Sequence, residues 1–224
     1  LIFALLVVGI HTEPFGFSFI LDKGFGIVTR LCVPFFFVSS SYLFFSRNSS
    51  ALKYVKRLLL LYFVWCMLYL SINISQIKEM TLPQILYHYF WHGHDVLWYL
   101  WASVLGFLIT YGLSKVLNPK SILILGIAFL LIGCIKSTYA PLLKRLFSIS
   151  IPDLLESRNG LFYAFPYYAL GLLIAKKGSA NSPNIKRCLL RLAMCLCLLV
   201  VESAIFVLVF KTENTILWLA VFPL

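Results

Sequence analysis

Residues 58–75 read LLLLYFVWCMLYLSINIS and contain no acidic or basic side chain. An apolar run of this length is typical of a helix that crosses the hydrocarbon core of a bilayer. Inside that core every backbone N–H and C=O must be bonded within the protein, so only α-helices and closed β-barrels are stable there. The run shows no alternation of polar and apolar residues, and it therefore predicts a helix.

The composition of the whole chain agrees with this interpretation. The 224 residues are 61% hydrophobic and only 12% charged, whereas an ordinary soluble domain is about 45–50% apolar and about 25% charged. So few polar side chains cannot cover a water-soluble globule. We expect lipid to surround most of the chain.

Eight apolar segments follow one another without a Gly/Ser-rich linker or a repeat, which predicts one domain over residues 1–224. The fold class expected is all-α, a polytopic transmembrane helix bundle. The first and last segments are shorter than the roughly twenty residues a span needs, so we expect both to be truncated and the chain to be a fragment. The segments are 1–12, 25–45, 58–75, 96–115, 121–135, 160–175, 187–210 and 215–224.

The net charge of +11 has a topological explanation. Three alternate connections, 46–57, 115–120 and 176–191, hold eleven of the nineteen basic residues and none of the eight acids. Cytoplasmic loops of membrane proteins accumulate Lys and Arg. We therefore place these connections, and the segment that precedes Leu1, on the cytoplasmic side of a plasma membrane, and we expect no nucleic-acid partner.

Three polar side chains are expected towards the outer face. His11 ends the first segment, and an imidazole there can serve as a general base or as a plain interfacial hydrogen-bonding group. Arg30 lies about five residues into the second segment, where it either snorkels to headgroups or contacts an anion. Arg158 precedes a helix start, where a cation opposes the helix dipole, which favours a functional role.

The stretch HYFWHGHDVLWYLW at residues 88–101 offers a further candidate site. His88 and His92 could share a helix face and bind a metal. Aromatic and His-rich stretches are, however, also typical of the membrane interface, and we predict no metal site. Trp98 and Tyr99 are then a suitable wall for a sugar or a pantetheine chain. The six cysteines all lie in or beside apolar segments and are interpreted as packing residues.

The ordered set of these stretches resembles the integral-membrane acyltransferase 3 family. The resemblance is carried by His11, by Arg30 with VPFFFVSSSYLFF, by VKRLLLLYFVW, by LWYL at 97–100 and by RNGLFYAFPYYALGLLIAKK at 158–177. The chain departs from the family in having Ser41 where the family usually has Gly, and Val96 where it often has His. The Arg that the family places eleven residues before the His would precede Leu1.

The resemblance implies a multi-pass bacterial membrane enzyme that transfers an acyl group, usually acetyl, from acyl-CoA to a hydroxyl of a cell-surface carbohydrate. It implies His11 as the catalytic base, with Arg30, Arg158, Trp98 and Tyr99 as contacts to acyl-CoA or substrate. The expected partners are lipid, acyl-CoA and the carbohydrate, with no bound cofactor.

The membrane part of membrane-bound serine racemases carries the same pattern. That similarity implies the alternative of an amino-acid uptake module, in which two arginines would bind the substrate carboxylate. A membrane scaffold whose arginines only snorkel is the third possibility.

Overall fold

The computed structural model describes residues 2–12, 24–26, 28–47, 49–78, 80–87, 97–137, 139–140, 143, 158–178 and 185–205. Every regular element in these ranges is a helix, which confirms the all-α prediction. The elements are α1 (Ile2–Thr12), α3 (Cys32–Ser46), α4 (Ala51–Ile72), α5 (Ile74–Ile77), α6 (Leu82–Ile85), α7 (Trp98–Leu113), α8 (Pro119–Lys136), the π-helix η3 (Gly160–Ala164), α10 (Phe165–Lys177) and α11 (Ile185–Ile205).

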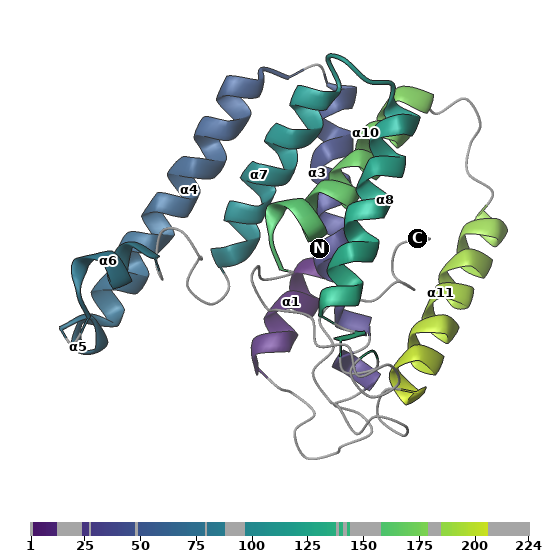
Figure 1. The fold of residues 1–224 in the computed structure, drawn as a ribbon. Helices are drawn as coiled ribbons and strands as arrows, with labels where there is room; N and C mark the ends of the chain where they lie inside the picture. Colours follow the sequence, from purple (N-terminus) through teal and green to yellow (C-terminus); the bar gives the residue numbers. More distant parts are fainter. Residues whose placement is uncertain are drawn as a thin grey trace.

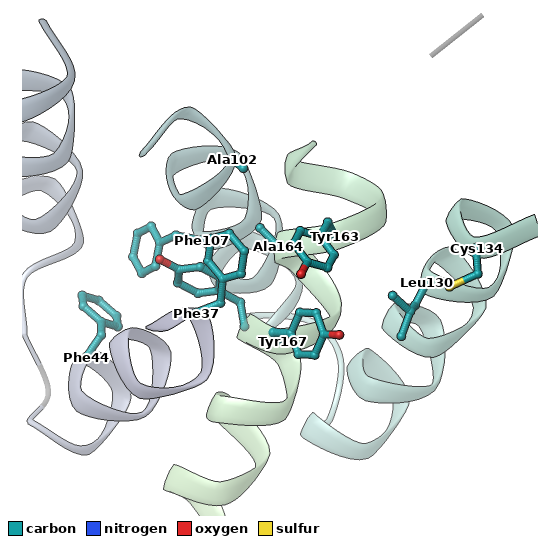
Figure 2. Packing of buried hydrophobic residues seen from close by; sticks show 10 residues of the cluster. Phe37, Phe44, Ala102, Phe107, Leu130, Cys134, Tyr163, Ala164 and Tyr167 are labelled. Atoms are coloured by element: carbon teal, nitrogen blue, oxygen red, sulfur yellow. The ribbon is translucent and has the colours of Figure 1, made fainter. Parts of the chain in front are cut away.

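Four helices form the centre of the molecule. Figure 1 shows α3, α7, α8 and α10 side by side, with α1 beside α3, α4 splayed outward on one side and α11 on the other. The buried core between these helices is strongly aromatic, and Figure 2 shows part of it. Phe37 from α3 and Phe107 from α7 are fully buried there, together with Tyr168 from α10.

Small residues allow the central helices to approach closely. A Cβ on Gly171 of α10 would meet the Val38 carbonyl and, at 2.6 Å, the Cβ of Ser41 on α3. The Ser41 hydroxyl also donates a 2.6 Å hydrogen bond to the Tyr168 carbonyl. On the next interface, a Cβ on Gly106 of α7 would lie 2.7 Å from that of Ala164. Such close contacts are the means by which apolar helices associate in lipid.

The outer helix α4 is apolar on nearly all sides. Only Tyr62 and Cys66 of its 22 residues are buried, and the Tyr62 ring stacks on Trp101 of α7 with centroids 5.8 Å apart. Water would make this exposed apolar surface costly. Helices α4 and α8 are the two in the described residues that are long and apolar enough to cross a bilayer, while Cys32–Ser46 and Trp98–Leu113 are shorter apolar helices.

Two boundaries differ from the prediction. Arg30 lies in a turn before α3, not inside a helix, because the ring of Pro34 would clash with the carbonyl of residue 30 in a continuous helix. The basic stretch 46–57 is mostly helix, since α4 begins at Ala51. Leu, Lys and Arg are good helix formers, and long basic side chains can extend along an apolar helix end to reach water.

The remaining segments agree in type with the prediction. Asn118 caps α8 by accepting a 2.9 Å hydrogen bond from the Ser121 amide, and Pro119 occupies the first turn. The short helices α5 and α6 were not predicted. Segment 215–224 and most of the expected outer loops lie outside the described residues.

Candidate functional site

The first turn of α7 and the start of η3 bring aromatic and basic side chains together. The Arg158 guanidinium lies over the Trp98 ring, with its Cζ 5.8 Å from the ring centroid. The Trp98 and Tyr163 rings are also 5.8 Å apart. A guanidinium over an aromatic face is held by the quadrupole of the ring, so Trp98 orients Arg158.

Arg30 approaches the same place from the turn before α3. It is half-buried, and it interacts electrostatically with both Tyr163 and Arg158. Two guanidinium groups within electrostatic range repel each other, and a bound anion would lower that cost. The planar fork of a guanidinium suits a carboxylate, a phosphate or a developing oxyanion.

A π-helical turn, η3, fixes the direction of the backbone that follows Arg158. The Asn159 side chain accepts hydrogen bonds from the Leu161 and Phe162 amides at 2.9 and 2.8 Å, and η3 follows at Gly160. A Cβ on Gly160 would collide with Leu105 of α7. Because π-helical turns are uncommon and concentrate at functional sites, η3 supports a specific role for Arg158 and Tyr163.

Tyr99 lies next to this cluster and anchors it to the middle of the bundle. Its ring stacks on Phe37 at 4.8 Å, and the Ser103 hydroxyl donates a 2.7 Å hydrogen bond to its backbone carbonyl. The Tyr54 hydroxyl lies 2.9 Å from that of Tyr168. This contact joins α4 to α10.

His11 is in the last turn of α1, and its side chain is exposed. Helix α1 packs on α3, where the Phe3 and Phe35 rings stack at 4.1 Å. Among the described residues, no hydrogen bond or ring contact joins His11 to Arg30 or Arg158. The structure therefore brings together four of the predicted site residues, Arg30, Arg158, Trp98 and Tyr99, and leaves His11 at the edge.

The predicted alternative of a metal site falls on His88 and His92, which lie outside the described residues. Within the described ranges, no group of three or more His, Cys, Asp or Glu side chains is placed to hold a metal. Cys32, Cys66, Cys134 and Cys195 are buried thiols, as expected of packing residues, whereas Cys197 is exposed.

Sequence reasoning did not assign a functional role to Tyr163, Ser40, Tyr139 or Glu202. The Tyr163 ring lies 5.8 Å from that of Trp98 and interacts electrostatically with both guanidinium groups, yet it stands among several tyrosines of the 158–177 stretch. Ser40 belongs to a run of three serines, which is usually a sign of close helix packing. Glu202 carried the clearest signal, since an acid in an apolar helix is rare.

Taken together, the fold and the site define an all-helical, membrane-associated protein with a cationic and aromatic site at one end of its bundle. The sequence profile of the acyltransferase 3 family, described as an acyltransferase domain, matches residues 1–224. The chain belongs to this family, as its motifs indicated.

Curated relatives are named racemases. The chain is 31% identical over 208 residues to an amino-acid racemase of Enterococcus faecalis, covering 81% of this chain and 27% of that protein. It is 27% identical over 209 residues to a serine/alanine racemase of Enterococcus gallinarum, covering 80% of this chain and 28% of the relative. The chain thus corresponds to under a third of these proteins. No solved structure gives a significant match.

Proposed function

We propose that this chain is a membrane-bound O-acyltransferase that moves an acyl group, acetyl above all, from acyl-CoA to a hydroxyl of a cell-envelope carbohydrate. The observation that carries the proposal is the Arg158 guanidinium over Trp98, with Arg30 in electrostatic range of it, in a chain of the acyltransferase 3 family. Two fixed cations are what a phosphorylated donor and a developing oxyanion both require.

The proposal places the protein in a bacterial plasma membrane as a multi-pass bundle. The α3–α4 and α7–α8 connections and the end of α10 lie at one end of the molecule (Figure 1). These are the three basic regions, and the positive-inside rule assigns that end to the cytoplasm. The end of α8 and the end of α11 lie at the opposite end, which would be the outer face.

In the proposed reaction His11 removes the proton from the acceptor hydroxyl as its oxygen attacks the thioester carbonyl. The new C–O bond forms, and the carbonyl electron pair moves onto oxygen, where Arg30 or Arg158 stabilises the charge. The C–S bond then breaks, and CoA leaves as a thiol with the proton that His11 returns. Trp98 and Tyr99 would pack against the sugar or the pantetheine chain.

Replacement of the proposed base tests the chemistry. His11→Ala should lower transfer of label from acyl-CoA to envelope glycans by about 10²-fold or more, the usual contribution of a general base. The assay uses membranes with equal amounts of each protein. Thr12→Ala is the control, because Thr12 is the exposed neighbour and its hydroxyl bonds only the Gly9 carbonyl among the described residues. Undiminished acylation by His11→Ala would remove His11 from the mechanism.

The names of the relatives favour a second candidate, an amino-acid uptake module without acyl transfer. The guanidinium pair would then bind the amino-acid carboxylate. Proteoliposomes that accumulate labelled L-serine without acyl-CoA would support this candidate. Accumulation should fall at least tenfold with Arg30→Ala, as expected when a charge-assisted pair is lost.

A further inference from the structure

The first two turns of α4 carry a row of basic side chains on one face of the helix. Lys56 and Arg57 lie three and four residues after Lys53, and all three side chains are exposed. Side chains at this spacing are neighbours on a helix surface. The start of α4 therefore presents three cations side by side.

The same face of α4 continues as an apolar surface. Four apolar residues follow the basic row at helical spacing, each with between 46% and 62% of its surface exposed: Leu60, Leu61, Val64 and Leu68. The opposite side of α4 holds its two buried residues, Tyr62 and Cys66, and the Tyr62 ring stacks on Trp101 of α7. The basic row and the apolar surface below it therefore face away from the bundle, at whose outer side α4 stands (Figure 1).

The cations of the basic row have no acidic side chain near them to neutralise their charge. The sequence contains no Asp or Glu between Asp22 and Glu79, a range that includes the whole of α3 and α4. Within the described ranges the acid is Glu202, which lies in the last turn of α11, at the end of the molecule opposite to the start of α4 (Figure 1). Like charges held side by side favour the binding of an anion.

An anionic phospholipid matches both parts of this face. Its phosphate suits the guanidinium of Arg57 and the two ammonium groups, and its acyl chains suit the exposed leucines below them. Basic clusters beside the end of an apolar helix bind anionic headgroups in this way. A soluble phosphate would leave the apolar surface unused, and a neutral lipid would leave the cations without a counter-charge.

The competing explanation is topology alone. Lys and Arg accumulate in cytoplasmic connections whether or not they bind a lipid. That rule requires positive charge at this end of the molecule, but it requires no particular helix face and no alignment with an apolar surface. The alignment on α4 is the observation that favours a bound lipid.

We propose that Lys53, Lys56 and Arg57, together with the apolar surface that continues their face of α4, form a binding site for one anionic phospholipid. The site lies on the outer side of the bundle and is separate from the cluster around Arg158. The inference does not depend on acyl transfer, and it requires only that α4 lies in lipid.

Equilibrium lipid binding to the purified chain in a neutral detergent tests the proposal. The probes are phosphatidylglycerol and phosphatidylcholine with identical acyl chains, so that only the headgroup charge differs. We expect phosphatidylglycerol to bind at least about tenfold more tightly, as three basic side chains near an anionic headgroup should provide. The double variant Lys56→Gln, Arg57→Gln should lower this preference at least about fivefold.

The matched control removes two charges from the same end of the molecule but from another helix. Lys176 and Lys177 are exposed at the end of α10, and the double variant Lys176→Gln, Lys177→Gln should keep the wild-type preference within about twofold. Equal losses in the two double variants would show that general charge, not the face of α4, attracts the lipid, and would overturn the proposal. Equal binding of both lipids by the wild-type chain would overturn it as well.

A third probe distinguishes a lipid from a soluble phosphate. Glycerol phosphate has the anionic group without acyl chains, and a hundredfold excess should displace little phosphatidylglycerol, because the contacts with the exposed leucines are missing. Complete displacement by glycerol phosphate would show that the apolar surface contributes nothing, and it would contradict the assignment of this face to a phospholipid.

Discussion

Single residues determine how the site is presented. Asn159 bonds two amides at the start of η3, and Arg158 precedes it on the chain. Without the Asn159 side chain, the Leu161 and Phe162 amides at the start of η3 would lose their hydrogen-bond acceptor. The position of the Arg158 guanidinium over Trp98 therefore depends on the side-chain oxygen of Asn159.

Substitution of Asn159 tests this dependence. Asn159→Ala should cost about 1 kcal/mol of stability and lower acyl transfer or ligand affinity several-fold, because Arg158 loses its fixed direction. Asn159→Asp keeps an oxygen acceptor and should retain most of the wild-type activity. Thermal unfolding in detergent and the transfer assay measure the two effects. Equal activities of the Ala and Asp variants would contradict the role assigned to the cap.

The contact between the Tyr54 and Tyr168 hydroxyls makes a second prediction at the residue scale. Tyr54→Phe and Tyr168→Phe each remove one side of the same 2.9 Å contact, and hydrogen bonds between membrane helices are worth about 0.6 kcal/mol on average. The double variant should therefore lose less stability than the sum of the two single variants. A double-mutant cycle of unfolding free energies gives the coupling, and strict additivity would show that the two hydroxyls do not interact.

At the scale of helices, the close approach of α3 and α10 holds the site together. Gly171→Ala should destabilise the bundle by about 1–3 kcal/mol, since the added Cβ would overlap Ser41 and the Val38 carbonyl. Gly112→Ala is the matched control, because nothing lies within 4 Å of its Cβ. Abundance in membranes and the midpoint of thermal unfolding provide the comparison. The packing account fails if both variants behave alike.

The helices themselves followed from the sequence because long apolar runs have few alternatives in lipid. The sequence did not predict where α4 begins, since the length of an apolar run does not show how far a helix extends into its basic end. It also did not predict the turn at Arg30, because the length of the run does not show that Pro34 shortens α3. Arg158, Trp98 and Tyr99 stood out as charged or interfacial residues. Their partner Tyr163 did not, because contacts between distant helices leave no mark in a single sequence.

At the scale of the whole molecule, distant stretches meet at one end of the bundle. Arg30 comes from the turn before α3, Trp98 from α7 and Arg158 from the approach to η3. The basic connections gather at the other end (Figure 1). This polarity separates a cytoplasmic donor side from an outer acceptor side in the proposed orientation.

The most direct test of the account is the rate of labelled acetyl transfer from acetyl-CoA by membranes that contain equal amounts of wild-type protein, Arg30→Ala, Arg158→Ala and the control Arg47→Ala. Arg47 is exposed at the opposite end of α3. We expect the first two variants to lose at least about tenfold, as for the loss of a charged contact in the transition state, and the control to keep the wild-type rate. Wild-type rates in both Arg30→Ala and Arg158→Ala would contradict the central claim.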